Sequence, residues 1–161
     1  MKNQKAIFLL PFIIVVILLT GCAFHAIRPP IPQRAEEDGP RKVEVAEDPQ
    51  EKAKFEKAAQ DYRSAATKPM LPEEAHKYKV QAEGSVRDKK FDDAAQLYGK
   101  ALDIAPWWPE GHFNRAIILG ESKYYQGAIR EMKRYLALVP NAPDARAAQD
   151  KIYDWEHKAG K

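Results

Sequence analysis

Beyond residue 48, apolar residues recur at the three- and four-residue spacing of a helix face. The spacing predicts six helices, at 49–66, 72–87, 91–104, 109–120, 124–138 and 143–157. Pro72 and Pro109 stand at predicted helix starts, where proline is tolerated because its missing N–H would have no partner there. The expected fold class is therefore all-α.

The pattern also repeats at a fixed interval. Residues 91–106 recur in spacing as residues 125–140, so that Ala94 corresponds to Ala128 and Pro106 to Pro140. Residues 55–65 carry the same pattern at an offset of 36. The constant 34-residue interval between the two full copies indicates stacked helical units.

Small and large residues occupy matching places in the two full copies, which we divide as 75–108 and 109–142. The small positions are Ala82, Ala94, Ala116 and Ala128; the large ones are Tyr78, Phe91, Tyr98, His112, Tyr125 and Met132; and the closing prolines are Pro106 and Pro140. Alanines let two helices approach closely, while the large side chains fill the adjoining space. In these positions the chain resembles the tetratricopeptide repeat (TPR) family.

Several positions depart from the family's pattern. Arg115 stands where leucine is usual and Tyr135 where alanine is usual. Lys89 and Lys123 occupy the turn position within each repeat that usually holds glycine. The matches at the second helix of each repeat and the 34-residue interval carry the resemblance.

The resemblance implies a short TPR-type antiparallel helical array of about two repeats, with residues 143–158 as a capping helix. Residues 49–67 form a flanking helix. This helix is either a lone second helix of a repeat, covering the open edge of the first repeat, or an ordinary amphipathic helix. In both cases we expect it to pack on the array.

Residues 1–21 have the features of a signal peptide. Lys2 and Lys5 precede an apolar run of about fourteen residues, shorter than the roughly 20 that cross a bilayer. The ending Leu-Thr-Gly-Cys at 19–22 resembles the bacterial lipobox. The resemblance implies cleavage before Cys22 and acylation of its sulfur and new amino group with chains such as palmitate. An uncleaved membrane anchor with an incidental cysteine is the alternative.

The resemblance also places the protein in the bacterial cell envelope. Ala23 follows the cysteine, and it is aspartate at this position that tends to retain such lipoproteins at the inner membrane. We therefore expect a lipid-anchored protein on the periplasmic face of the outer membrane. Residues 22–48 are rich in proline and charge, which predicts a solvated tether with a reach of roughly 80 Å when extended. Its residues 29–32 are a spacer or a ligand for a proline-reading domain.

Charge and motifs exclude several kinds of function. The formal charge is +3, and without Lys2 and Lys5 it falls to +1, so no electrostatic footprint for nucleic acid is present. The four histidines, His25, His76, His112 and His157, do not pair at metal-ligand spacing. Nucleophile and phosphate-loop motifs are absent. We expect no enzymatic activity, metal, cofactor or small-molecule substrate.

The family resemblance implies a binding groove lined by the first helix of each repeat. The candidate residues are Lys79, Glu83, Val86, Phe113, Asn114, Ile117, Glu121 and Lys151. Phe113 and Ile117 lie one helical turn apart, so they are either an apolar anchor for a partner or simply part of the core. Trp107 and Trp108 either plug the seam between repeats or stack on a sugar.

Three functions follow as expectations. The first is a membrane-anchored scaffold or adaptor that binds a protein or peptide of the cell envelope through the array. The second is a structural subunit whose outer helix faces dock into an envelope assembly or secretion complex. The third is a glycan- or peptidoglycan-binding protein that uses Trp107 and Trp108.

Overall fold

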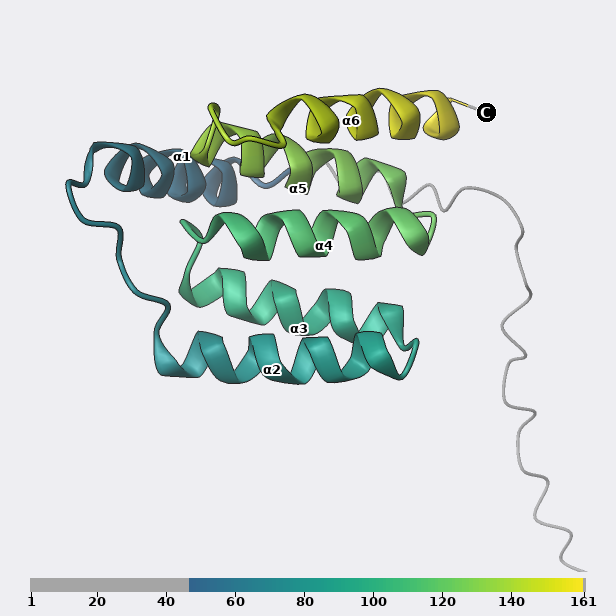
Figure 1. Ribbon diagram of the computed structural model, residues 1–161, viewed down its shortest axis with the longest axis horizontal. Helices are drawn as coiled ribbons and strands as arrows, with labels where there is room; N and C mark the ends of the chain where they lie inside the picture. The colour runs from purple at the N-terminus through teal and green to yellow at the C-terminus, as the bar shows by residue number, and fades with distance from the viewer. Residues whose placement is uncertain (1–46, 161) are drawn as a thin grey trace, which may run out of the picture. The chain divides into compact units, whose positions relative to one another are not determined.

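The computed structural model describes residues 47–160, and within that range the chain forms six α-helices and no strand (Figure 1). They are α1 (Pro49–Ser64), α2 (Glu73–Arg87), α3 (Phe91–Ile104), α4 (Pro109–Glu121), α5 (Tyr125–Leu138) and α6 (Ala145–Ala159). The described chain is therefore all-α, as the hydrophobic pattern predicts. The expected signal peptide, Cys22 and most of the expected tether lie outside the described residues. No described helix has the length and apolar character needed to span a bilayer.

The predicted helix boundaries lie within two residues of the observed ones. The main difference is at α6, which begins at Ala145 rather than at Pro143. A turn closed by the Ala145 N–H and the Ala142 carbonyl precedes it. Asp144 is held in this turn because its carboxylate accepts a hydrogen bond from the Tyr135 hydroxyl at 2.5 Å.

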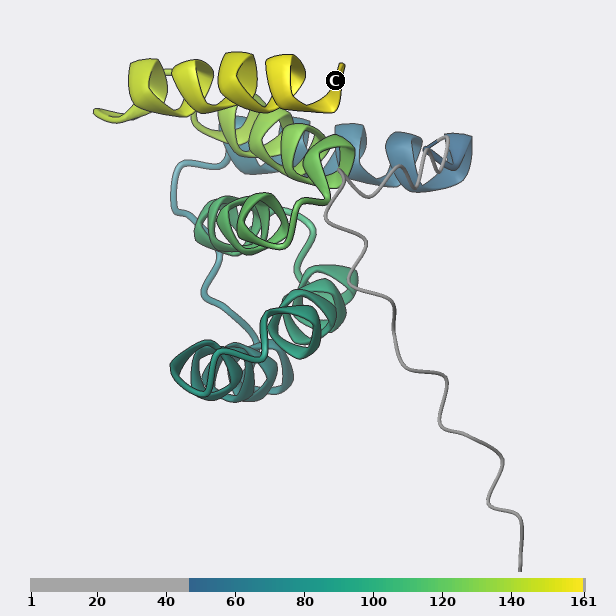
Figure 2. The same ribbon diagram turned by 90° about the vertical axis from the view of Figure 1, so that its right-hand side faces the viewer.

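Helices α2 to α6 form a row in which each helix packs on the next (Figure 1). Short connections make successive helices antiparallel. In the second view α2, α4 and α6 lie along one side of the row, and α3 and α5 lie along the other (Figure 2). The row is thus a helical array with two distinct sides.

Alanines at the helix crossings explain the close packing of this array. Ala82 on α2, Ala94 on α3, Ala116 on α4 and Ala128 on α5 have no exposed surface. Each alanine corresponds to another at the 34-residue interval. A larger side chain at any of these positions would force the helices apart, which costs about 1–3 kcal/mol in a well-packed core.

The turns within the array repeat at the same interval. Lys89 has φ 58° and Lys123 has φ 63°, both in the left-handed region. Each turn is closed by a hydrogen bond between residues five apart in the sequence. The bonds run from Lys90 N–H to the Ser85 carbonyl and from Tyr124 N–H to the Leu119 carbonyl, both at 2.8 Å. This arrangement is the Schellman motif, in which glycine is the favoured left-handed residue.

Two clusters of buried side chains fill the array. The first lies among α2, α3 and α4 and includes Tyr98 and Trp108, whose rings stack with centroids 6.1 Å apart. The second lies among α4, α5 and α6 and includes Met132 and Ile152. Leu119 on α4 packs against both clusters. The core is therefore continuous along the row.

Helix α1 does not cover the open edge of the first repeat, so the first of the two alternatives for this helix is wrong, although the helix does pack on the array. It packs on α5, on the side occupied by α3 and α5 (Figure 2). Phe55 meets His112 edge-on at 5.4 Å, and Tyr62 stacks on Trp107 at 6.3 Å. The exposed residues of α2, which include His76, Lys77 and Gln81, are mostly polar, so α2 offers no apolar stripe to receive α1.

Replacing Lys89 with glycine should stabilise the fold. A non-glycine residue in the left-handed region carries strain of about 1–3 kcal/mol, only part of which is offset by the greater freedom of glycine in the unfolded chain. We expect Lys89→Gly to raise the free energy of unfolding in urea melts, by about 1 kcal/mol.

The matched control is Lys90→Gly, one residue further on, where φ is −90° and glycine relieves no strain. This variant should be neutral or less stable than the natural chain. Equal effects of the two substitutions would contradict the assignment of strain to Lys89.

Candidate binding face

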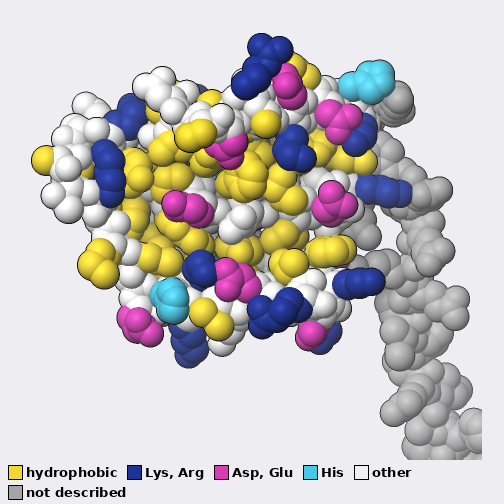
Figure 3. All heavy atoms as spheres, viewed as in Figure 1, with side chains coloured by type: hydrophobic (Ala, Val, Ile, Leu, Met, Phe, Trp, Pro, Cys, Tyr) yellow, Lys and Arg dark blue, Asp and Glu magenta, His cyan; other side chains and the backbone are white. Residues whose placement is uncertain are grey.

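The side of the array formed by α2, α4 and α6, here called the α2–α4–α6 face, carries the residues predicted to bind a partner. Figure 3 shows hydrophobic side chains gathered across the middle of this face, with acidic side chains scattered among them. The sequence-predicted residues belong to all three helices. The α2–α4–α6 face is therefore the candidate surface for binding a partner.

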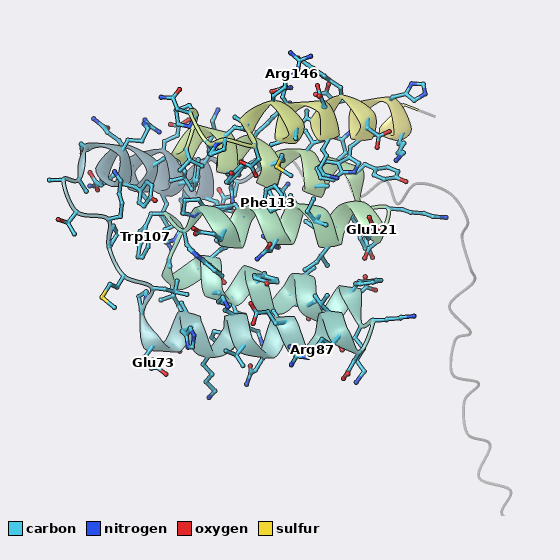
Figure 4. All side chains as sticks on the ribbon, in the orientation of Figure 1. Glu73, Arg87, Trp107, Phe113, Glu121 and Arg146 are labelled. Carbon is cyan, nitrogen blue, oxygen red and sulfur yellow. The ribbon has the colours of Figure 1, made fainter. Side chains whose placement is uncertain are left out.

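Phe113 lies on α4 near the centre of the face (Figure 4), and Ile117 lies one helical turn further along the same helix. Both side chains are half-buried and pack against the second cluster. The Phe113 ring meets Tyr135 edge-on at 5.2 Å, and the Tyr135 hydroxyl is held by Asp144. Burial, followed by this hydrogen bond, raises the pKa of Tyr135 to about 12. The pair thus serves both as the edge of the core and as a fixed apolar surface.

The α2 residues of the predicted site mostly interact with one another. Lys79 Nζ lies 2.6 Å from Glu83 Oε1, one helical turn away, so the two charges neutralise each other on this part of the face. Val86 is half-buried against the first cluster. The α2 end of the face therefore offers a paired charge and a partly covered aliphatic group.

The remaining predicted residues behave differently from one another. Asn114 Nδ2 donates to the hydroxyl of Tyr98 at 3.3 Å, which turns the amide toward α3. Burial, with Glu83 as a further cause, raises the pKa of Tyr98. Glu121 is exposed at the end of α4 (Figure 4), and Lys151 is exposed on α6. The face therefore does not bring the predicted polar residues to one point.

Trp107 and Trp108 are packed into the structure. Trp107 stacks on Tyr62, and Trp108 is buried against Tyr98. A Cβ atom added at Gly111 would lie 2.2 Å from the Trp108 ring, so this position requires glycine. At least one face of each indole is thus occupied by a tyrosine and is closed to a sugar. Among residues 47–160, no group of three or more His, Cys, Asp or Glu side chains could hold a metal ion.

A buried charge cluster on the other side of the array was not predicted from the sequence. Glu131 on α5 has no exposed surface. One of its carboxylate oxygens lies 2.7 Å from His112 Nδ1, and the other accepts a hydrogen bond from Arg115 Nη1 at 2.8 Å. A signal existed, because Glu131 interrupts the apolar stripe between Ala128 and Tyr135.

The geometry specifies how His112 takes part in this cluster. Its Nε2 atom lies 2.9 Å from the carbonyl oxygen of Pro106, while Nδ1 faces Glu131. Both neighbours are acceptors, so both contacts are hydrogen bonds at once only when both ring nitrogens carry a proton. Each ring nitrogen of His112 therefore has a partner, and this buried histidine joins α4 to α5.

Arg134 connects the same cluster to α1. Its Nη2 atom bonds Glu47 at 2.5 Å and Glu51 at 2.9 Å, and its guanidinium lies 5.1 Å from the centre of the Phe55 ring. Burial would lower the pKa of Arg134, but the carboxylates of Glu131, Glu47 and Glu51 outweigh it and raise that pKa. Together these contacts fasten α1 over the buried charges.

The pKa of Glu131 shows that the effect of its partners is larger than the effect of its burial. Burial alone would raise the pKa of Glu131. The hydrogen bond from His112 and the positive charges of Arg115, His112 and Arg134 reverse this effect and lower the pKa from 4.5 to about 2. Because the carboxylate is fully buried, it cannot reach a substrate. It therefore serves to hold α1, α4 and α5 together.

Replacing Glu131 with glutamine should destabilise the fold strongly. The change leaves two arginines and His112 around a neutral amide, and breaking a buried pair in this way costs about 3–5 kcal/mol. We expect the free energy of unfolding at pH 7 to fall by this amount in urea melts. Glu121→Gln, the same change at an exposed position of α4, should have almost no effect.

The pH dependence supplies a second measurement. A carboxyl group with a lowered pKa stabilises the fold above its unfolded value of 4.5, and this contribution is lost as the pH falls toward about 2. The natural chain should lose more stability over this window than Glu131→Gln. A Glu131→Gln protein whose stability at pH 7 differs from that of the natural chain by no more than an ordinary surface substitution, about 0.5 kcal/mol, would contradict this role.

Comparison of the chain with known protein families and with curated proteins finds no match.

Proposed function

We propose that this protein is a membrane-anchored scaffold of the bacterial cell envelope. Its helical array, a short TPR-type array, binds a protein or peptide partner through the α2–α4–α6 face. The observation that carries the proposal is the pair Phe113 and Ile117, half-exposed at the centre of this face and held in place by Tyr135. A fixed apolar pair loses little conformational entropy on binding, which favours its use as an anchor.

The repetition of local structure supports the TPR assignment. The buried alanines, the two Schellman turns and the inter-repeat turns all recur at the same 34-residue interval. In the inter-repeat turns, Trp108 N–H bonds the Ala105 carbonyl and Ala142 N–H bonds the Val139 carbonyl, both at 3.1 Å. Such agreement between independent features is what a tandem helical repeat requires.

The signal-peptide features and Cys22 support the proposed location of the protein at a membrane. A cysteine carrying two or more acyl chains anchors stably, because each buried CH₂ contributes about 0.8 kcal/mol. The proline-rich tether would then hold the array away from the lipid. A short array offers a short groove, so a second component tethered to the same membrane would gain from its high effective concentration.

Removing the thiol of Cys22 should release the protein from membranes. Without the sulfur no diacylglycerol can be attached, and cleavage that depends on it is blocked. We expect the natural chain to float with the membrane fraction as a mature, cleaved protein, whereas Cys22→Ser should not appear in that form. Thr20→Ser, a small change at a nearby position, is the control. A mature, cleaved Cys22→Ser protein that still floats with membranes would refute the anchor.

Truncating Phe113 should strongly weaken capture of the partner. We expect Phe113→Ala to weaken binding by at least about 2 kcal/mol, as for a central hot-spot residue. The measurement is crosslinking and co-purification from intact envelopes, quantified for each variant, with circular dichroism to confirm folding. Ile117→Ala should act in the same direction.

Tyr153→Ala is the matched control, since Tyr153 is 58% exposed and points about 200° around α6 from Lys151. Capture that survives Phe113→Ala but is lost with Gln96→Arg, on the exposed side of α3, would favour a structural subunit that docks by its outer helix faces.

A further inference from the structure

A groove of about 430 Å³ lies between α1 and α5, away from the α2–α4–α6 face. Its apolar lining comes from Phe55, Ile129 and Ala137. Its charged lining consists of four cations, Lys52, Arg130, Lys133 and Arg134, and two carboxylates, Glu47 and Glu56. Lys52 pairs with Glu56 at 3.9 Å and Lys133 with Glu156 at 3.3 Å, whereas Arg134 is held by Glu47 and Glu51. The groove is separate from the surface assigned to partner binding. An apolar floor whose lining holds more cations than carboxylates fits a segment in which apolar and acidic residues alternate.

Arg130 is the cation best placed to receive a carboxylate. Its Nε atom is buried and has no hydrogen-bond partner among the described residues. The nearest carboxylate oxygen, Glu131 Oε1, lies 4.0 Å away and already accepts a hydrogen bond from Arg115. The Arg130 side chain as a whole is 31% exposed, so the groove contains a partly buried cation whose Nε lacks an acceptor.

The described chain begins at the rim of this groove. Glu47 lines the groove and is fixed there by its hydrogen bond to Arg134. The residues before it, 42–46, read Lys-Val-Glu-Val-Ala. In an extended segment Val43 and Val45 point to one side and Glu44 to the other. Apolar and acidic residues thus alternate in the part of the chain that is covalently held beside the groove.

The length of the groove also matches the extended length of residues 42–46. Along α5 the groove extends from Gln126 to Ala137, which is about 16 Å at roughly 1.5 Å per residue. Five extended residues span about 16 Å. Residues 42–46 can therefore line the groove from end to end without a loop.

We propose that residues 42–46 pack into the groove between α1 and α5, with Val43 and Val45 against Phe55 and Ile129 and with Glu44 at Arg130. The segment loses little entropy on binding because Glu47 already holds one end of it at the groove. The last part of the tether then belongs to the folded domain. The free tether ends near residue 41, which shortens its extended reach to roughly 60 Å.

Nuclear Overhauser effects test this directly in the chain from residue 22, with Cys22→Ser to keep it free of lipid. We expect cross-peaks from the Val43 and Val45 methyl groups to the Phe55 ring and the Ile129 methyl groups. These cross-peaks should occur within one molecule and should not depend on protein concentration. Random-coil methyl shifts for both valines, with no such cross-peaks, would overturn the proposal.

Substitution supplies the second measurement. Val43→Ser combined with Val45→Ser should lower the ratio of folded to unfolded protein about tenfold or more, because two apolar side chains lose their burial. Val80→Ser, the same change at a 48% exposed position of α2, should lower it about twofold at most. A double variant as stable as the control would count against the packing.

The same experiments distinguish residues 42–46 from two other candidate occupants of the groove. Cross-peaks between differently labelled chains would assign the groove to a second copy of the protein and overturn the proposal. Shifts of Phe55 and Ile129 only after addition of a separate peptide with the sequence of residues 42–46, with none from the attached segment, would also overturn it. Partner capture through Phe113 is unaffected by either result, so the two proposals fail independently.

Discussion

The arrangement of the helices depends most on the hydrogen bonds and ion pairs of the buried Glu131 carboxylate. A charge with no exposed surface is tolerated only when its partners are in place. Those partners come from α4, and Arg134 extends the network to α1, while Arg115 also donates to the Ala95 carbonyl on α3. One acidic side chain thus constrains the positions of four helices.

The array itself could be predicted from the sequence because its determinants are local. Apolar spacing specifies each helix, and the 34-residue interval of alanines specifies how neighbouring helices cross. The position of α1 could not be predicted in this way. Phe55 and Tyr62 indicate an apolar stripe, but their partners His112 and Trp107 lie in a distant part of the chain, and Arg134 is 83 residues from Glu51. An amphipathic stripe shows that a helix must pack without showing where.

Two of the departures from the TPR pattern have a structural explanation. Arg115 stands where that pattern has leucine, and in this protein it pairs with Glu131. Tyr135 stands where the pattern has alanine, and its ring supports Phe113. The sequence predicted Phe113 and Ile117 as candidate binding residues. It did not predict that Lys79 pairs with Glu83, one helical turn away on the same face of α2. The orientation of Asn114 toward Tyr98 depends on the packing of α3 against α4, which no local pattern contains.

The position of Glu47 connects the two sides of the array to the proposed function. The described chain begins beside α1 and α5, on the side away from the α2–α4–α6 face. The proposed tether would join the domain there and leave the face with Phe113 free for the proposed partner. Helix α1 covers the charged cluster on the side where the described chain begins, so this side gains stability from contacts that would be lost if it had to open for a partner. In the proposed function, attachment and recognition lie on different sides of a small domain, because the side that α1 keeps closed is the side on which the described chain begins.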